Sequence, residues 1–352
     1  MRKISEEELK EILEDHKVWL KFNKKYGKRE NYGKRACLRD VDLSGVDLAK
    51  ANLSEASLSG ADLSNANLSD AILSDANLTK ANLNHADLSE ANLSKANLFN
   101  ANLRHADLSG VNLTEANLRH ADLQYANLAE ANLNHADLSE ANLSKASLEY
   151  ANLCHADLSE ANLSKANLTE VNLQYANLAE AYLYEANLFK AYLSEADLTR
   201  ANLIKADLDH ADLNHANLFK ANLSYADLQY ANLAEANLYK ADLKCVNLSH
   251  ANLKFVDLSG IDLTYSNLAY TNLNSTNLLH AKLPNRIIQI GPIGSRKSYT
   301  VINLDDDIIH CGCWKGNFKE FKDRINETYP DDGEYRTQYL AVLQLIESLK
   351  AK

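Results

Sequence analysis

The sequence has few cysteines and no long apolar run. Its five cysteines are scattered and odd in number, so they do not make a disulfide framework. No apolar run approaches the roughly eighteen residues of a membrane span, and no charged-then-apolar leader opens the chain. From these absences we expect no membrane helix and no signal peptide, and therefore a cytoplasmic protein.

The chain also lacks a catalytic set and a basic face. No Ser/His/Asp set or pair of carboxylates can be placed in a concave site, so we expect neither an enzyme nor a bound cofactor. The net charge is −11. Residues 36–285 carry sixteen Lys and Arg against thirty-one Asp and Glu, a net charge of −15. Nucleic-acid-binding proteins usually present a basic face, so we expect no direct nucleic-acid binding.

The chain does contain a five-residue motif, A-[DN]-L-x-x, which is repeated fifty times from Ala36 to Asn285 without an insertion or deletion. All fifty central positions are leucine. Forty of the positions two residues earlier are alanine, and forty-three of the positions just before leucine are Asn or Asp. Repeats of this regularity indicate a solenoid, in which each unit packs only on its neighbours.

A period of five fits neither regular secondary structure. On an α-helix, residues five apart are offset by about 140°, so the leucines would spiral around the helix. On a straight strand, an odd step would place alternate leucines on opposite faces. The chain must therefore turn once per pentad, with Leu and the preceding Ala facing an axis and the other three residues facing water.

This pattern resembles the pentapeptide repeat family over residues 36–285. The resemblance implies an all-β solenoid, a right-handed quadrilateral β-helix with four pentads in each coil. Fifty pentads then make about 12.5 coils and a shaft of roughly 60 Å at the spacing of hydrogen-bonded strands. Larger or polar residues replace alanine mainly near the two ends, which suggests that those coils are fitted to caps: Val41, Val46, Val246, Val256, Ile261, Ser266, Thr271 and Thr276.

We expect three domains: 1–35, a capping helix with a basic linker; 36–285, the β-helix; and 286–352, a β-then-α module. In the first, residues 5–22 show helical spacing of apolar residues, and Ser5 with Glu8 makes a capping box. This helix would cover the open edge of the first coil or, alternatively, bind a partner. The linker Lys21–Arg39 is a solvated connection or a contact for an anionic partner.

The last domain resembles the tail of some pentapeptide repeat proteins. Its pattern predicts strands at Arg286–Ile290, Tyr299–Leu304 and Ile308–Trp314, with a turn at Gly291–Gly294. A capping pair, Asn317 and Glu320, predicts a helix through about residue 327, and a second helix is expected over about 334–349. Covering the last coil is the simplest role for this module.

The fifth residue of each pentad forms outward columns of residues twenty apart. One column runs from acidic to basic: Glu140, Glu160, Glu180, Arg200, Lys220 and Lys240. Aromatic and histidine residues gather near the end of the repeats and form a candidate interaction patch, because exposed aromatic clusters mark contact sites. Either the C-terminal module covers this patch or a second copy or partner does: Tyr225, Tyr230, His250, Phe255, Tyr265 and Tyr270.

Histidines recur at the same outward position, with His85 and His105 one coil apart and His135 and His155 likewise. No carboxylate–His–Cys cluster of ligand spacing accompanies them, so we expect no metal site. In the tail, His310-Cys311-Gly312-Cys313 resembles only half a zinc site, and buried small side chains explain the cysteines as well. The loop Gly291–Arg296 could hold an anion, but it lacks the phosphate-binding pattern.

Three hypotheses for function follow, of which the third is an enzymatic or metal-binding role for the C-terminal module. The first is a non-enzymatic structural or protein-interaction protein, a rigid acidic rod with an unknown protein partner, which could also form a homodimer through one end. The second rests on the resemblance: some relatives imitate duplex DNA and bind type II topoisomerases such as gyrase. Duplex DNA would carry roughly 35 charges over ~60 Å, against a net −15 here, so the charge match is partial.

Overall fold

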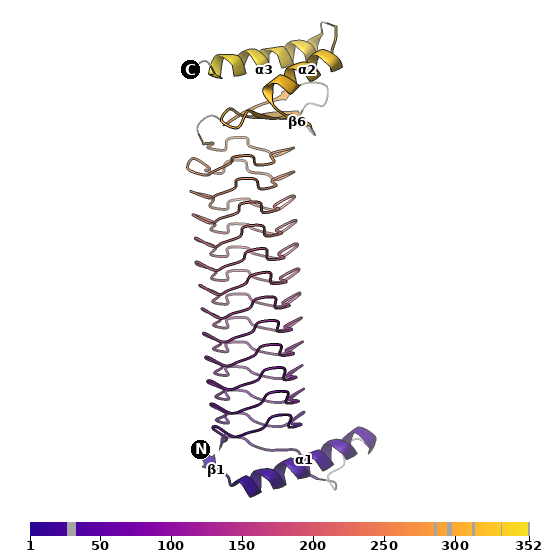
Figure 1. Cartoon of the computed structure of the whole chain (residues 1–352), viewed down its shortest axis with the longest axis vertical. Helices are drawn as coiled ribbons and strands as arrows, with labels where there is room; N and C mark the ends of the chain where they lie inside the picture. Colours follow the sequence, from indigo (N-terminus) through magenta and orange to yellow (C-terminus); the bar gives the residue numbers. More distant parts are fainter. Residues whose placement is uncertain (27–32, 285–286, 294–297, 312–313, 332, 351–352) are drawn as a thin grey trace. The chain divides into compact units, whose positions relative to one another are not determined.

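The structure is a computed structural model that describes residues 1–26, 33–284, 287–293, 298–311, 314–331 and 333–350. It divides into two compact units, Met1–Asp197 and Leu198–Lys352, each described here by itself. The first unit holds an N-terminal helix and stacked coils of pentads. The second holds further coils and then a sheet with two helices (Figure 1).

Each coil contains four pentads, because backbone pairing joins residues twenty apart. In the first unit, the Leu63 N–H donates to the Asn82 carbonyl at 2.7 Å, and the Asn82 N–H donates to the Ala61 carbonyl at 2.9 Å. The same step pairs Asn202 with Asn222 in the second unit. Ala61 and Leu63 are fully buried, and nearly every other Ala and Leu of the pattern is likewise buried. The predicted inward pair is confirmed.

The fifth residue of each pentad forms a corner. The Ala66 N–H donates to the Leu63 carbonyl at 3.0 Å and closes a turn, in which Asn65 has φ = 57°. Residues other than glycine rarely adopt this left-handed conformation. Here the Asn65 N–H also donates to the Asn84 carbonyl of the next coil at 2.9 Å, so hydrogen bonds hold the strained residue on both sides. Side chains at these positions therefore project from four corner columns.

Helix α1 (Glu6–Tyr26) lies beside the first coil in Figure 1. His16 is completely buried, and its Nδ1 accepts the Ala36 N–H at 3.1 Å. A short strand, β1 (Arg2–Lys3), pairs in parallel with β2 (Val41–Asp42). Strand β1 is not expected from the sequence, because its two charged residues lie outside the repeat and carry no strand pattern.

The C-terminal module begins with an antiparallel sheet of order β3-β4-β5-β6. Its strands are β3 (Ile287–Ile293), β4 (Ser298–Asn303), β5 (Ile308–Cys311) and β6 (Trp314–Gly316). The predicted single strand from Ile308 to Trp314 is wrong, since β5 ends at Cys311 and β6 pairs back on it. Strand β3 also continues through most of the predicted turn, to Ile293.

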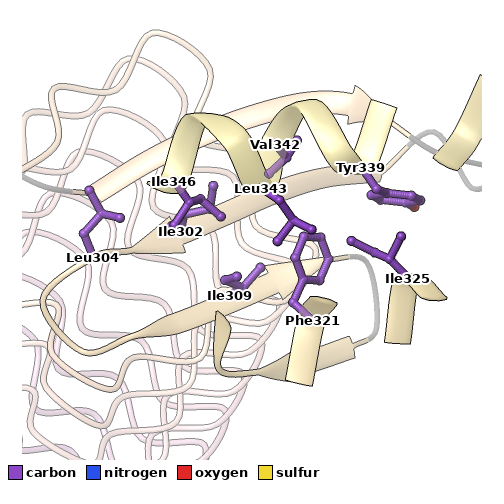
Figure 2. Packing of buried hydrophobic residues seen from close by; sticks show 9 residues of the cluster. All are labelled: Ile302, Leu304, Ile309, Phe321, Ile325, Tyr339, Val342, Leu343 and Ile346. Atoms are coloured by element: carbon purple, nitrogen blue, oxygen red, sulfur yellow. The ribbon is translucent and has the colours of Figure 1, made fainter. Parts of the chain in front are cut away.

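Two helices cover one face of this sheet: α2 (Phe318–Thr328) and α3 (Glu334–Lys350). Both predicted helices are confirmed, and Asn317 with Glu320 forms the reciprocal capping box. The core between sheet and helices is a single apolar cluster (Figure 2). Its buried members are Ile302, Leu304, Ile309, Phe321, Ile325, Tyr339, Val342, Leu343 and Ile346.

Successive side chains of β5 point to opposite sides of the strand, and one of these sides faces the last coils. Ile309 faces the helices, while its neighbour His310 points to the coils, where Nε2 donates to the Thr271 carbonyl at 3.1 Å. The Gln289 side-chain amide similarly donates to the Thr276 carbonyl at 3.3 Å. The hydroxyls of Thr271 and Thr276 donate to carbonyls of the preceding coil, each at 2.8 Å. The module thus bonds to the backbone carbonyls of Thr271 and Thr276, while the hydroxyls of these residues bond within the coils.

Candidate interaction surface

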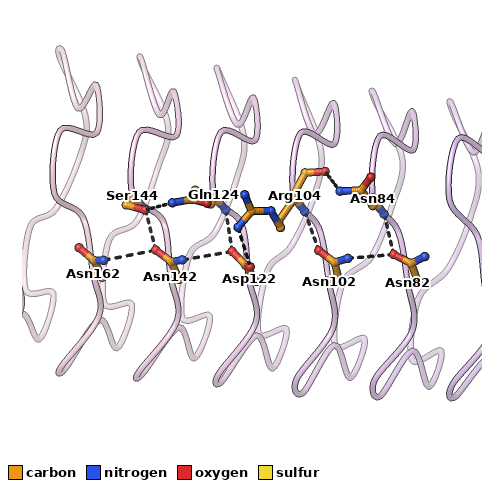
Figure 3. A network of polar contacts seen from close by, with 9 residues as sticks. All are labelled: Asn82, Asn84, Asn102, Arg104, Asp122, Gln124, Asn142, Ser144 and Asn162. Carbon is orange, nitrogen blue, oxygen red and sulfur yellow. Dashed lines mark hydrogen bonds and ion pairs between the residues drawn. The ribbon is translucent and has the colours of Figure 1, made fainter.

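The Asn and Asp residues that precede most of the leucines hold the outward faces of the coils in place. The Asn102 side-chain oxygen accepts the Arg104 N–H at 3.2 Å, and its amide donates to the Asn82 side-chain oxygen at 2.9 Å. The first bond closes a local turn, and the second links two coils. Similar bonds join Asn142 to Asp122 and Asn162 to Asn142, and the Arg104 side chain reaches Asp122, as Figure 3 shows. Corner side chains therefore project from a backbone that is braced along and between coils.

Rings at corner positions stack from coil to coil. In the first unit, His85 stacks on His105 at 4.7 Å between ring centroids, and His105 stacks on Tyr125 at 4.8 Å. We call this set ring ladder 1. Its centroid spacing is close to the separation of neighbouring strands, because each ring belongs to the next coil. Parallel aromatic rings at this spacing contribute a modest attraction beyond their buried area.

Ring ladder 2 repeats this sequence fifty residues later. It contains His135, His155 and Tyr175, with centroid distances of 4.8 and 4.9 Å. Fifty residues correspond to two and a half coils of four pentads, so the two ladders lie on opposite corners of the first unit. The near-copies of sequence around residues 84–98 and 134–148 therefore face opposite sides of the first unit.

The tyrosines that end these two ladders have opposite electrostatic surroundings. The Lys145 ammonium donates to the Tyr125 hydroxyl at 2.7 Å and holds the pKa of Tyr125 below its usual value. At the equivalent place, the Glu195 carboxylate raises the pKa of Tyr175. Two near-identical surfaces thus present phenols of different acidity.

Ring ladder 3 lies in the second unit and contains part of the predicted patch. Tyr230 stacks on His250 at 4.6 Å and His250 on Tyr270 at 4.8 Å, with His210 stacked on Tyr230 at 4.7 Å. Sequence analysis placed these residues in one column, and the ring contacts confirm the column.

The six predicted residues do not share one face. Tyr225 and Tyr265 lie one corner before ring ladder 3 and Phe255 one corner after it, since four corners complete a coil. The C-terminal module does not cover the patch: Tyr230 is 46% exposed and Tyr265 78% exposed. Asp306 of the module accepts the Tyr270 N–H at 2.7 Å, yet the Tyr270 ring stays half exposed. Covering by the module is therefore not the explanation of this patch.

The histidine pairs show no arrangement for a metal ion. The rings of His85 and His105 are parallel within 5°, and those of His135 and His155 within 2°, so they contact through their faces. Within the described part of the chain, no group of three His, Cys, Asp or Glu residues is placed to ligate a metal. Cys313 and much of the loop after Ile293 fall outside that part, so the half zinc site and the anion loop stay predictions.

Cys311 lies in a small polar cluster at the edge of the module's core. The Thr300 hydroxyl donates to its sulfur at 3.2 Å, and the Tyr339 hydroxyl lies 4.0 Å away. Burial raises the pKa of Tyr339, with the neighbouring thiol adding to the effect. The partly buried sulfur beside this phenol packs against the module's apolar cluster, consistent with the interpretation of this cysteine as a small core residue.

One surface hollow was not foreseen. It has a volume of about 300 Å³ in the first unit and is lined by two carboxylates of one corner column, Glu140 and Glu160. Tyr182 occupies a position that is Asn or Asp in most pentads, and its large ring forms one wall. The exception to the repeat at Tyr182 was the signal that could have located the hollow.

These features define a repeat protein of the β-solenoid class with braced outward columns. The chain belongs to the pentapeptide repeat family, whose members fold as right-handed quadrilateral β-helices. The family model for pentapeptide repeats matches eight copies, most of which overlap: residues 36–75, 76–114, 112–149, 146–183, 181–218, 216–254, 241–278 and 257–285. No curated protein matches the chain.

Several solved structures are similar to this chain. HetL, a pentapeptide repeat protein involved in heterocyst differentiation regulation from the cyanobacterium Nostoc sp. strain PCC 7120, is 32% identical. The match covers 73% of this chain and 94% of HetL, with a TM-score of 0.30. A trypsin-treated form of QnrB1, a plasmid-mediated fluoroquinolone resistance protein, is 19% identical over 51% of this chain and 90% of its own, with a TM-score of 0.39.

A further similar structure is Rfr23 from the cyanobacterium Cyanothece 51142. It is 27% identical over 38% of this chain and 88% of its own, with a TM-score of 0.26. Among the helices of the described residues, none is both long and apolar enough to cross a membrane.

Proposed function

We propose that this chain is a non-enzymatic protein-interaction scaffold that binds a protein partner through outward columns of side chains. The observation that carries the proposal is ring ladder 3, whose aromatic rings are exposed although the adjacent module has its own apolar core. Exposed aromatic groups on a rigid backbone bind at a low cost in conformational entropy. Buried Leu and Ala side chains fill the axis of the described repeats, where a catalytic site would need a cavity.

The domain organisation is part of the same proposal. Residues 36–285 form about 12.5 coils, residues 1–35 cap the first coil and residues 286–352 cap the last. Support comes from the Ala36 N–H bond to His16 and from the contacts of His310 and Gln289 with Thr271 and Thr276. End caps block the open strand edges through which solenoids associate. We also propose a cytoplasmic location, since the four described cysteines are free thiols.

Replacing the four exposed tyrosines of the patch together tests the scaffold proposal: Tyr225→Ser, Tyr230→Ser, Tyr265→Ser and Tyr270→Ser. A matched control replaces exposed tyrosines of the first unit, Tyr125→Ser, Tyr150→Ser, Tyr175→Ser and Tyr192→Ser. Quantitative pull-downs from a lysate of the source organism are compared for the wild type and both variants. We expect specific partners to be lost only with the patch variant, whose thermal unfolding must match that of the control. Equal recovery of every partner by all three would overturn the assignment to this patch.

A topoisomerase-binding DNA mimic is the second candidate, favoured by the net charge of −15 over residues 36–285. Ion pairs between coils weaken the charge argument for mimicry, because they neutralise part of the negative charge. Lys95 pairs with Glu115, Lys165 with Glu185 and Arg119 with Glu140. A gyrase supercoiling assay, titrated with the purified protein with and without a fluoroquinolone, tests it. Inhibition or drug protection at low micromolar protein would favour mimicry, and no effect would leave the scaffold proposal.

A further inference from the structure

One face of the second unit has exposed tyrosines along both of its edges. Ring ladder 3 forms one edge, where Tyr230 and Tyr270 are about half exposed. Tyr225 and Tyr265, which are more exposed still, belong to the corner column that precedes ring ladder 3 and form the other edge. We call the surface between these edges the tyrosine face. Its central column, joined by backbone pairing from coil to coil, is Asp207, Asp227, Asn247 and Asn267.

Two carboxylates on successive coils begin this central column. Asp207 and Asp227 are partly buried, and neither forms an ion pair with a described residue of the unit. Asp209 lies at the ladder edge of the same face, where its Oδ1 is 2.7 Å from Nδ1 of His210. Burial raises the pKa of Asp207, and the charges of Asp227 and Asp209 add to this effect. A cation placed between these carboxylates would relieve their repulsion.

Exposed rings elsewhere in this unit already contact lysines. The Lys254 Nζ lies 4.7 Å from the centroid of the Phe255 ring, and the Lys240 Nζ lies 5.1 Å from that of Tyr239. Contacts of this length are attractive, because the face of an aromatic ring carries partial negative charge. Within the described residues, no lysine or arginine lies over the four tyrosines of the tyrosine face. These rings are thus available to a cation from another molecule.

We propose that the tyrosine face binds an arginine-rich segment of a partner protein. The planar guanidinium of arginine can lie flat on a tyrosine ring while its N–H groups donate two hydrogen bonds to a carboxylate. The tyrosine face offers both groups in one coil, since Tyr225 and Tyr230 lie on either side of Asp227. The inference rests on the proposed function, because it names the chemistry of the partner that ring ladder 3 binds.

Charge favours a basic protein segment over a nucleic-acid strand. Nucleic-acid bases also stack on exposed rings, but the proteins that bind them surround those rings with positive charge. Here three carboxylates lie on the tyrosine face, and a fourth, Asp306, accepts the Tyr270 N–H at 2.7 Å at the module end of ring ladder 3. The two edge columns from residue 205 to residue 270 contain a single lysine, Lys205. Phosphates would be repelled at both ends of the ladder, whereas guanidinium groups would be attracted.

Fluorescence anisotropy with the full chain in a low-salt buffer tests the inference. The probe is a labelled peptide of alternating arginine and glycine, and a second probe has lysine in place of arginine. Asp207→Asn with Asp227→Asn removes the central charges but keeps the oxygens that accept the Asp209 and Gln229 N–H groups. Asparagine also occupies this place in many other pentads, so the variant should fold. We expect it to bind the arginine peptide about tenfold more weakly than the wild type does.

A matched control, Asp242→Asn with Asp257→Asn, makes the same charge change at the same place in the pentad. These two residues lie on the two faces that do not border ring ladder 3, so the control should bind within about twofold of the wild type. The wild type should also prefer the arginine peptide to the lysine peptide. Three results would overturn the inference: no binding by the wild type, equal weakening in the variant and the control, or tighter binding of a single-stranded thymidine oligonucleotide than of the arginine peptide.

The tyrosine variant that tests the scaffold proposal separates a failure of this inference from a failure of that proposal. Partners that are lost with the tyrosine variant but retained by Asp207→Asn with Asp227→Asn would leave ring ladder 3 as a binding site and overturn only its recognition of arginine. Partners retained by both variants would overturn both. If the aspartate variant unfolds at a lower temperature than its control, the preference of the wild type for arginine decides, and equal binding of the two peptides overturns the inference.

Discussion

Lys145 donates from its ammonium to the Tyr125 hydroxyl across one coil, at 2.7 Å, and its Nζ lies 4.8 Å from the centroid of the same ring. Fifty residues further on, the equivalent tyrosine, Tyr175, lies beside Glu195 instead. The repeat supplies the same backbone position twice, and only the variable fifth residue of the next coil differs.

We expect Tyr125 to ionise at lower pH than Tyr175. The phenolate of Tyr125 is stabilised by Lys145, and that of Tyr175 is opposed by Glu195, so their pKa values move in opposite directions. Titration of ring-labelled tyrosine by NMR would measure both. Lys145→Ala and Glu195→Ala should bring the two titrations together, and a persistent order in the double variant would contradict this cause.

Replacement of a core leucine should be costly. Leu123→Ala should reduce the free energy of unfolding by roughly 2–5 kcal/mol, because neighbouring coils cannot close around the void without breaking their pairing. The neighbouring exposed change Glu130→Ala serves as control and should fall within about 0.5 kcal/mol of the wild type. Urea unfolding followed by circular dichroism gives both values. Equal midpoints for the two variants would show that the axis is not tightly packed.

The polar ladder makes its own contribution to stability. Asn102→Ala removes the acceptor for the Arg104 N–H and the donor to Asn82, so we expect a loss of about 1–3 kcal/mol. Asn102→Ser keeps a short acceptor near the Arg104 N–H and should lose less. Thermal unfolding of the two variants is the measurement. Identical stabilities would mean that water replaces the ladder without cost.

Acid should weaken the C-terminal module through His310. Burial lowers the pKa of this ring to about 4, with Lys315 adding to the effect. Because the folded pKa lies below the ordinary value of 6.5, the stabilisation is complete above pH 6.5 and is lost as the pH falls towards 4, by up to about 3 kcal/mol. Unfolding at pH 7.5 and 4.5, followed by Trp314 fluorescence in a Trp19→Phe background, measures the loss. His310→Gln should flatten this dependence, and an unchanged dependence would assign it to other groups.

Docking of the N-terminal helix should depend on one glycine. Gly33 has φ = 69°, and an added Cβ would lie 2.4 Å from the Asp15 carbonyl oxygen of α1. Gly45 has nearly the same φ, 68°, with no atom within 4 Å of such a Cβ. Gly33→Ala should therefore destabilise α1 far more than Gly45→Ala. Hydrogen exchange of the α1 amides is the readout, and equal protection in both variants would refute the close contact.

Much of the fold was predictable, because each pentad has few ways to bury its leucine. Leu63 and Ala61 are inward by periodicity alone, and the capping box of Asn317 and Glu320 is a local hydrogen-bond pattern. Strand β1 was not predictable, since Arg2 and Lys3 become a strand only by pairing with the first coil. The division of the tail at Cys311 was missed because β6 is three residues long.

The sequence predicted which residues of the candidate surface stack in one column from coil to coil. It did not predict which of them lie together on one exposed face. Residues twenty apart stack once a coil has four sides, so His250 between Tyr230 and Tyr270 follows from the repeat. Whether the patch is covered depends on where the module lies, and no local pattern encodes that position. The hollow beside Tyr182 likewise arises from one large ring among small neighbours in successive coils.

The sequence by itself determined that this chain is a solenoid, because a period of five leaves only a turning backbone able to point every leucine at one axis. Tertiary structure decided what meets at the surface. Contacts between coils determine which rings stack, and they place Lys145 beside Tyr125 and Glu195 beside Tyr175. Packing of the module places the His310 ring beside the Thr271 carbonyl. Those contacts join residues about twenty to forty positions apart, and only the stacking of coils, or for His310 the packing of the module on the last coils, brings them within hydrogen-bonding distance.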